Sequence, residues 1–411
     1  MDEKNILIDR PIYLNEIRGF IDKPFVKVIK GIRRSGKSQL LKLIQREVLQ
    51  MTDGGHIIEM NFEMSEFFDI KSYIELAKYV EDRIKDEKKY YIFLDEVQEV
   101  EGWEKAVNSI RLMNTDIYVT GSNSKLTDTD YSKLLGGRTV SFNVYPLSFT
   151  EFVDFRKECA VKDDPSLDEY IRLGGFPSVS MFDYTERDAR RIVTDIHNTA
   201  LFRDVIKRNA VKNPQLMDKI VAFLYDNVGN LVSPSGIANY LRSRGRKGID
   251  HETIVKYIRY LEEGFIIRRA QRYDVKGKRL LETNDKYYLT DHSLQYVVRD
   301  LRADRIQGIL ENIVYMELVR RGYGVSVGKF DTREVDFVAE KTDGQKIYVQ
   351  VCLEFSSDEV YRREFAPLKE IKDNFPKYVI SMDRFAERID EGVVGIHLRD
   401  FLLNGDNSDG I

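Results

Sequence analysis

The sequence predicts an α/β protein of more than one domain, in which the first part is a parallel sheet covered by helices. Its 411 residues exceed the ~250–300 residues that one hydrophobic core usually organises. Apolar residues make up 42% of the chain and charged residues 32%, which excludes a mainly disordered chain. Short apolar runs alternate with amphipathic stretches from the start of the chain to residue 120, and this alternation is typical of a parallel sheet.

The first predicted unit is a strand, a glycine-containing loop and a helix. An apolar, β-branched run over 25–29 stops at Gly31, and apolar residues recur at helical spacing from 39 to 49. The run Tyr-Tyr-Ile-Phe-Leu at 90–94 is apolar enough for a strand buried on both faces. Three more elements are expected, namely strands at 56–62 and 116–120 and a polar-faced helix at 71–87.

The rest of the chain divides into further units. The charged stretch 156–168 is expected to be an exposed connection or lid, a helical section follows, and 216–267 contains three helices separated by turns. A last unit begins near 309, with helices at 311–321 and 361–374 and strands at 325–330, 334–340, 346–351 and 378–381. We therefore expect four domains, at 1–155, 156–215, 216–300 and 301–411.

The two cysteines and the N-terminal residues indicate the compartment. Cys159 and Cys352 are far apart in the sequence, which excludes a disulfide-dense scaffold and a cysteine-based zinc site and fits a reducing compartment. The charged N-terminus leads into no apolar segment, and nowhere do ~18 apolar residues run together. We expect a cytoplasmic protein without an export signal or a membrane span.

The net charge is small but unevenly distributed. The whole chain carries 64 basic and 68 acidic residues, a net charge of −4. The segment 231–290 carries 13 basic and 7 acidic residues, a local charge of +6, so the other residues carry −10. Segregation on this scale predicts a local face that attracts anions.

A loop of phosphate-binding pattern follows the first strand. Residues 31–38, Gly-Ile-Arg-Arg-Ser-Gly-Lys-Ser, fit G-x-x-x-x-G-K-[ST] between a buried strand and a helix N-terminus, which is the context of a P-loop. In such a loop backbone N–H groups surround phosphate oxygens, Lys37 reaches the β and γ phosphates, and Ser38 coordinates Mg²⁺. Arg33 and Arg34 either contact phosphate or face water. The predicted cofactors are ATP and Mg²⁺, with Gly31, Arg33, Arg34, Ser35, Gly36, Lys37, Ser38 and Gln39 as binding residues.

A carboxylate pair follows the apolar run at 90–94. Asp95 and Glu96 stand where the Walker B carboxylates of a P-loop protein stand, at the end of a buried strand. Asp95 is expected to hold Mg²⁺, together with Ser38. Glu96 is expected to act as the general base, or to orient the water that attacks the γ-phosphate.

Two further positions are candidates for catalysis. The strand at 116–120 leads into Gly121, Ser122 and Asn123, so that Ser122 or Asn123 can sense the γ-phosphate, although a plain turn explains the same residues. Arg138 follows two glycines and is a candidate arginine finger, either within the chain or across to a neighbouring subunit. The alternative for Arg138 is a solvated surface residue.

These motifs together resemble the prokaryotic AAA-type ATPases with a C-terminal restriction-nuclease-like domain. The resemblance is carried by the loop 31–38, by Asp95-Glu96-Val-Gln followed by Trp103, by Thr120-Gly121-Ser122-Asn123, and by Leu135-Gly136-Gly137-Arg138 leading into Tyr145-Pro146-Leu147-Ser148-Phe149. It implies an α/β protein with a P-loop NTPase core, then a winged-helix unit, then a mixed α/β domain of the PD-(D/E)xK nuclease fold.

The middle segment follows the pattern of a winged helix. A helix is expected after Ser233-Pro234 and a second one at 251–263, followed by a β wing with several cations. The second helix offers His251, Lys256 and Arg259 for base contacts. The wing cations are Arg268, Arg269, Arg272, Lys276, Lys278 and Arg279. DNA binding and protein binding are both open for this segment.

The last unit lacks part of a nuclease site. Glu311 and Asp336 match the first acidic positions of a restriction-type nuclease core. Gln350 and Cys352 stand where that core has a glutamate and a lysine, so that a metal ligand and a water-orienting ammonium are both missing. Glu354 is the one candidate replacement, provided that the strand continues that far. We expect a binding or assembly module that does not cut DNA.

Taken together, the sequence predicts a Mg²⁺-dependent ATPase that converts ATP to ADP and phosphate to drive a conformational switch. The alternative is a nucleotide-gated DNA-binding regulator with slow hydrolysis, and a metal-dependent nuclease is less favoured. The expected partners are ATP and ADP, DNA at the basic segment 231–290, a protein client and further copies of the chain.

Overall fold

The computed structural model describes residues 6–122, 136–245, 250–281, 284–298, 306–383 and 388–404. The backbone forms two compact units. The first comprises Met1–Pro146 and Glu263–Phe265, and the second comprises Leu147–Glu262 and Ile266–Ile411. The division of the chain into four domains stays a prediction.

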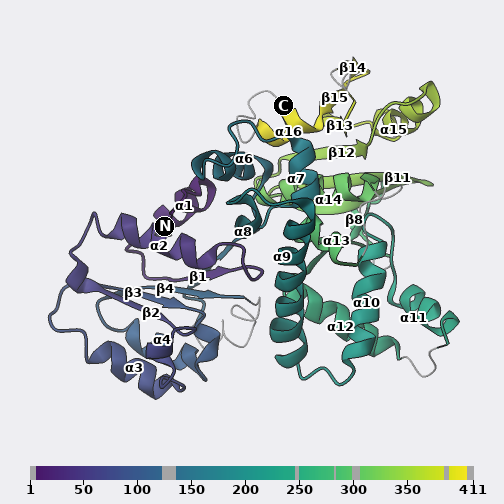
Figure 1. Ribbon diagram of the computed structural model, residues 1–411. Coiled ribbons are helices and arrows are strands. Elements are labelled where there is room, and N and C mark those ends of the chain that lie inside the picture. The colour runs from purple at the N-terminus through teal and green to yellow at the C-terminus, as the bar shows by residue number, and fades with distance from the viewer. Residues whose placement is uncertain are drawn as a thin grey trace. The chain divides into compact units, whose positions relative to one another are not determined.

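The first unit is a parallel sheet of five strands in the order β2-β3-β4-β1-β5 (Figure 1). The four strands predicted for this sheet are present, and each lies within two residues of its expected position. The fifth strand, β5, was not anticipated from the sequence. The bounds are β1 Val26–Lys30, β2 Ile57–Asn61, β3 Tyr90–Asp95, β4 Thr115–Gly121 and β5 Thr139–Asn143.

Helices cover both faces of this sheet (Figure 1). The helices α1 (Pro11–Arg18) and α2 (Lys37–Val48) pack on one face through residues such as Leu14 and Leu40. The helices α3 (Tyr73–Glu81) and α4 (Trp103–Ile110) pack on the other face through residues such as Leu76 and Trp103. Every residue of β3 is buried because the sheet is covered twice, as its continuous apolar run predicted.

The second unit begins with helices and ends in a mixed sheet. Its first helices are α6 Phe149–Glu158, α7 Leu167–Leu173, α8 Pro177–Ser180 and α9 Glu186–Thr199, which continues as a π-helix at Ala200–Lys207. The next are α10 Pro214–Asp226, α11 Pro234–Ser243 and α12 His251–Glu263. Helix α12 has the bounds that the sequence predicted, and α6 takes up the start of the expected exposed connection.

The mixed sheet has eight strands in the order β14-β15-β13-β12-β11-β10-β7-β8. Its strands are β7 Arg272–Asp274, β8 Arg279–Leu280, β10 Gly324–Phe330, β11 Arg333–Glu340, β12 Lys346–Cys352, β13 Lys377–Ser381, β14 Arg388–Asp390 and β15 Val393–His397. Its helices are α14 Ile306–Arg320, α15 Asp358–Glu370 and α16 Leu398–Leu403. A short helix, α13 Gln295–Val298, precedes α14.

The expected β wing is divided between two sheets. The strands β6 (Ile267–Ala270) and β9 (Lys286–Leu289) pair with each other, as the two sides of a wing do. The hairpin β7–β8 between them instead joins the edge of the mixed sheet, where β7 runs parallel to β10. The edge of β10 therefore pairs with β7, which belongs to a segment that the sequence analysis assigned to an independent wing.

Candidate nucleotide-binding site

The P-loop has the close backbone approach that its glycines predict. A Cβ at Gly31 would lie 2.0 Å from the carbonyl oxygen of Val144, so only glycine fits at the end of β1. Gly36 has a φ of +96° and directly precedes α2, which begins at Lys37. A side chain would be strained at this φ. The two glycines therefore set the path by which the chain turns from β1 into α2.

A buried arginine holds this loop from outside the motif. The side chain of Arg10 donates hydrogen bonds from Nη1 to the carbonyl oxygen of Ser35 (2.8 Å) and from Nη2 to that of Tyr145 (2.9 Å). Its guanidinium also lies 4.5 Å from the centre of the Tyr13 ring. Arg10 is only 2% exposed, so it works as a fixed part of the loop's support.

Lys37 lies inside the loop. It is 4% exposed, and its Nζ donates to the carbonyl oxygens of Gly31 and Ile32, both at 3.1 Å. The hydroxyl of Ser35 is buried beside it and has no hydrogen-bond partner among the described residues. An ammonium and a free hydroxyl donor therefore lie within the same turn of backbone.

Asp95 lies at the end of β3, beside the start of α2. Its carboxylate accepts hydrogen bonds from the hydroxyls of Ser38 and Thr120 and from Asn61 Nδ2 at 3.1 Å. Burial raises the pKa of Asp95 above its usual value, and the bonds from Thr120 and Ser38 oppose that shift. Ser38 and Asp95, the two predicted metal ligands, are thus in direct contact.

Glu96 is held in a conformation that is unusual for this residue. Its φ is +53°, a left-handed value, and its N–H donates to Thr120 Oγ1 at 2.9 Å. Its carboxylate accepts a hydrogen bond from Gln98 and lies 3.9 Å from Arg33 Nη2. Arg33 also pairs with Glu63 at 3.0 Å. The predicted general base is therefore close to Asp95, and side chains already contact its carboxylate.

The other predicted binding residues are placed differently. Arg34 and Gln39 are exposed, and their role in binding stays a prediction. Ser122 is buried at the end of β4, on the same edge of the sheet as Asp95. Asn123 lies outside the described residues.

Arg138 lies at the other edge of the sheet. Its carbonyl oxygen accepts a hydrogen bond from the N–H of Val26 (2.9 Å), the first residue of β1, whereas the P-loop follows the last residue of that strand. The five residues of β1 span ~16 Å at ~3.3 Å each. The structure therefore does not bring Arg138 together with Lys37, Asp95 and Glu96 of the same chain.

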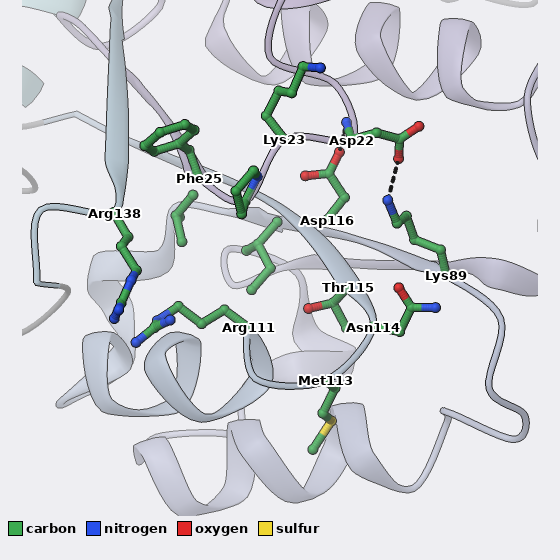
Figure 2. A pocket seen from close by; sticks show the side chains of 13 residues that line it. Asp22, Lys23, Phe25, Lys89, Arg111, Met113, Asn114, Thr115, Asp116 and Arg138 are labelled. Carbon is green, nitrogen blue, oxygen red and sulfur yellow. Dashed lines mark hydrogen bonds and ion pairs between the residues drawn. The ribbon is translucent and has the colours of Figure 1, made fainter.

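Arg138 lines a pocket of about 480 Å³ at that edge (Figure 2). The guanidinium groups of Arg111 and Arg138 lie close together at one end of the pocket, and Lys89 pairs with Asp22 at the other end. Burial lowers the pKa of Arg111, and the charge of Arg138 lowers it further. Two like charges thus meet beside the first residues of β1 and β5.

The residues at the P-loop edge fit a nucleoside triphosphate with Mg²⁺. The ammonium of Lys37 and the buried, unpartnered hydroxyl of Ser35 suit phosphate oxygens. Ser38 and Asp95 supply the oxygen ligands that Mg²⁺ prefers. This edge can therefore neutralise phosphate charge, hold a hard cation and place a carboxylate beside them.

Sequence reasoning missed three residues of this site. Arg10, Asn61 and Thr120 were not assigned a contact, although Thr120 was noted at the end of its strand. The signal for Asn61 and Thr120 is their position, because polar residues that end parallel strands meet at one edge. Arg10 has no such signal, because it reaches carbonyl groups 25 and 135 residues away.

Comparison with known families and proteins gives two family matches and two relatives. Residues 23–153 match a family described as AAA domain, and residues 164–305 match a domain of unknown function. A protein of Haemophilus influenzae described as uncharacterized is 38% identical over 403 residues, which is 97% of this chain and 99% of that protein. An uncharacterized protein of Methanocaldococcus jannaschii is 29% identical over 363 residues, which is 85% of this chain and 79% of that protein.

Solved structures show weaker likeness. The Aeropyrum pernix ORC1 protein in complex with DNA is 11% identical and covers 72% of this chain and 93% of its own, with a TM-score of 0.35. AMPPCP-bound DnaA from Aquifex aeolicus is 17% identical and covers 61% and 86%, with a TM-score of 0.30. Both TM-scores are too low to carry an argument.

A search of the described residues for a membrane-spanning helix finds none with the length and apolar character that a bilayer requires.

Replacing Thr120 by valine tests whether its hydroxyl stabilises the arrangement of Asp95 and Glu96. Valine keeps the shape but removes the acceptor of the Glu96 N–H and one donor to the carboxylate of Asp95. We expect the free energy of unfolding, measured by denaturant titration, to fall by about 1–3 kcal/mol. Thr120→Ser keeps the hydroxyl and is the control. A loss in Thr120→Val no larger than that in Thr120→Ser would show that the hydroxyl does not stabilise this site and would contradict this account.

Proposed function

This chain belongs to the same family as the Haemophilus influenzae protein and contains an AAA domain, and we propose that it is a Mg²⁺-dependent ATPase whose turnover drives a conformational switch. The observation that carries the proposal is the direct contact between Ser38 of the P-loop helix and Asp95 of β3, beside Lys37 and Glu96. A phosphate cradle, a cation site and a candidate base thus share one edge of one sheet.

Each residue has a distinct role in this proposal. When bound, ATP with Mg²⁺ supplies a phosphoryl group that can be transferred to water. Lys37 and the loop N–H groups neutralise and orient phosphate oxygens, and Ser38 and Asp95 would hold the ion. Glu96 orients a water molecule and accepts its proton on the carboxylate.

The contacts of Glu96 suggest how the switch is coupled to this site. Its carboxylate is bonded to Gln98 and lies near Arg33, which also pairs with Glu63. Both groups compete with water for the carboxylate of Glu96. Release of Glu96 from Arg33 and Gln98 would free the base and, in the same step, change the partners of Arg33 on the surface of the unit.

Lys37→Ala and Glu96→Gln should separate binding from hydrolysis. Loss of the Lys37 ammonium removes charged hydrogen bonds to phosphate, so ATP affinity should fall about 10- to 100-fold. Glu96→Gln should keep ATP affinity and lower turnover by about 10²- to 10⁴-fold, because it removes only the proton acceptor. Nucleotide titration and phosphate release measure the two effects. Similar, small effects of both substitutions on turnover would refute the site.

We further propose that Arg138 acts across an interface between two copies of the chain. It is exposed, and it lies at the opposite edge of the sheet from the P-loop of its own chain. A guanidinium there can approach phosphate held by a second copy more readily than phosphate held by its own.

Mixing variants tests this role. Arg138→Ala and Lys37→Ala chains are each defective, yet about one quarter of the interfaces in an equal mixture combine an intact Lys37 with an intact Arg138. We expect ATPase activity to recover in proportion. A mixture of Lys37→Ala with Glu96→Gln is the control, because both residues belong to one side of the interface. No recovery in mixtures that exchange subunits would exclude action across the interface.

A second candidate function is a nucleotide-gated DNA-binding regulator. It is supported by the exposed side chains of His251, Lys256 and Arg259 on α12, and of Lys278 and Arg279 on the β7–β8 hairpin. Two other cations of the predicted wing are paired with acids, namely Arg269 with Asp285 (2.7 Å) and Lys276 with Asp331 (2.5 Å).

DNA affinity measured against salt concentration tests this candidate. Lys278→Ala/Arg279→Ala should weaken binding and lower the slope of log affinity against log salt by about 2, because two phosphate contacts are lost. Lys212→Ala/Lys219→Ala removes the same charge from exposed positions at and just before α10 and should leave the slope unchanged. Equal effects of the two pairs, or no DNA binding by the unmutated chain, would favour protein contact instead.

A further inference from the structure

A buried lysine lies among three carboxylates in the second unit. Lys286 is the first residue of β9, and its side chain is 3% exposed. Its Nζ lies 2.6 Å from Glu334 Oε1, 3.3 Å from Glu311 Oε2 and 3.6 Å from Asp336 Oδ1. Glu334 and Asp336 come from β11 and Glu311 comes from α14. One ammonium thus joins three elements that are separate in the sequence.

Other protein donors also bond to two of these carboxylates. Glu311 accepts hydrogen bonds from the hydroxyl of Tyr288 at Oε2 (3.2 Å) and from Gln307 Nε2 at Oε1 (3.3 Å). Asp336 Oδ2 accepts one from the N–H of Val351 at 2.9 Å. The donors fix the orientation of both carboxylates toward Lys286.

Burial and the neighbouring charges shift the pKa values of the groups in this cluster. Burial raises the pKa of Glu311, and it raises the pKa of Asp336 to about 8, with the charge of Glu311 adding to the shift. The pKa of Lys286 is raised despite burial, because the three carboxylates favour its charged form. Lys286 therefore stays charged. The three carboxyl groups do not all carry a full negative charge, because one buried ammonium balances the charge of only one carboxylate.

The residues do not fit the divalent ion that a nuclease-like fold implies. Glu311 and Asp336 match acidic positions of that fold, but the point where their carboxylates converge is taken by Lys286 Nζ. The side chain of Gln350 accepts from the N–H of Asp336 (3.2 Å) and donates to Glu364 (3.0 Å), so it adds no charge. Strand β12 ends at Cys352 and Glu354 is exposed, so the condition for a replacement at Glu354 is not met.

We propose that Lys286 is the permanent cation of this cluster, that it takes the place of a divalent ion, and that it fastens β9 to α14 and β11. The unit then has a fixed ionic core instead of a nuclease centre. This inference is independent of ATP binding, because it concerns residues of the second unit alone.

The melting temperature of the full chain tests whether Lys286 fastens β9 to α14 and β11. Lys286→Met keeps the length of the side chain but leaves buried carboxylates without a cation, so the melting temperature of the second unit should fall by about 6–20 °C. Adding Glu311→Gln to that variant should restore at least half of the loss, because it removes a buried carboxylate that Lys286 pairs with. Lys346→Met is the matched control, because Lys346 forms a more exposed pair with Glu340 in the same sheet and should cost little. Equal losses at Lys286 and Lys346, or no rescue by Glu311→Gln, would overturn the proposal.

Mn²⁺ binding tests the exclusion of metal even where Lys286→Met does not fold. All proteins carry Asp95→Asn, which removes the predicted P-loop ion site, and bound Mn²⁺ is counted by electron paramagnetic resonance. We expect the same count with Asp336 intact and with Asp336→Asn. A bound ion that Asp336→Asn removes would show that the cluster is a metal site, and would overturn the proposal.

Discussion

The carboxylate of Asp95 stands at the end of a strand that is buried along its whole length, and the edge of the first sheet is arranged around it. A buried carboxylate is costly unless donors surround it. The donors come from three neighbours, namely Ser38 of α2, Asn61 of β2 and Thr120 of β4. Thr120 also accepts from the N–H of Glu96, so the hydrogen bonds that stabilise one carboxylate orient the backbone of the next.

Local patterns predicted four of the strands of the first unit and its P-loop. The strands and the P-loop follow from runs of adjacent residues, and the contact between Ser38 and Asp95 follows from the rule that parallel strands end at one edge. Arg10 was missed because a side chain that bonds to distant carbonyl groups leaves no pattern in its own neighbourhood. The strand β5 was missed because it has only one fully buried residue, Phe142, in its five positions.

The second unit was harder to predict because strand pairing is decided by partners far along the chain. The segment between β6 and β9 has the composition of a wing, but β10 offers it an edge, and the hairpin β7–β8 joins that edge. Local charge was misleading for a similar reason. Lys276 and Lys286 count as cations of the basic segment, yet acids beyond residue 310 pair with both of them. The anion-attracting face is therefore smaller than the composition indicates.

The placement of Lys37 and Arg138 at opposite edges of one sheet has a consequence for symmetry. Where an interface holds only one contact between these edges, the amino edge of one copy meets the carboxyl edge of the next and the arrangement is head to tail, whereas a twofold axis would place both contacts in the same interface. Two copies joined head to tail would each keep one edge without a neighbour. Adding further copies by the same rotation would give either a closed ring or an open helical filament. The terminal copies of a filament would each lack one neighbour, whereas every copy in a ring would be equivalent.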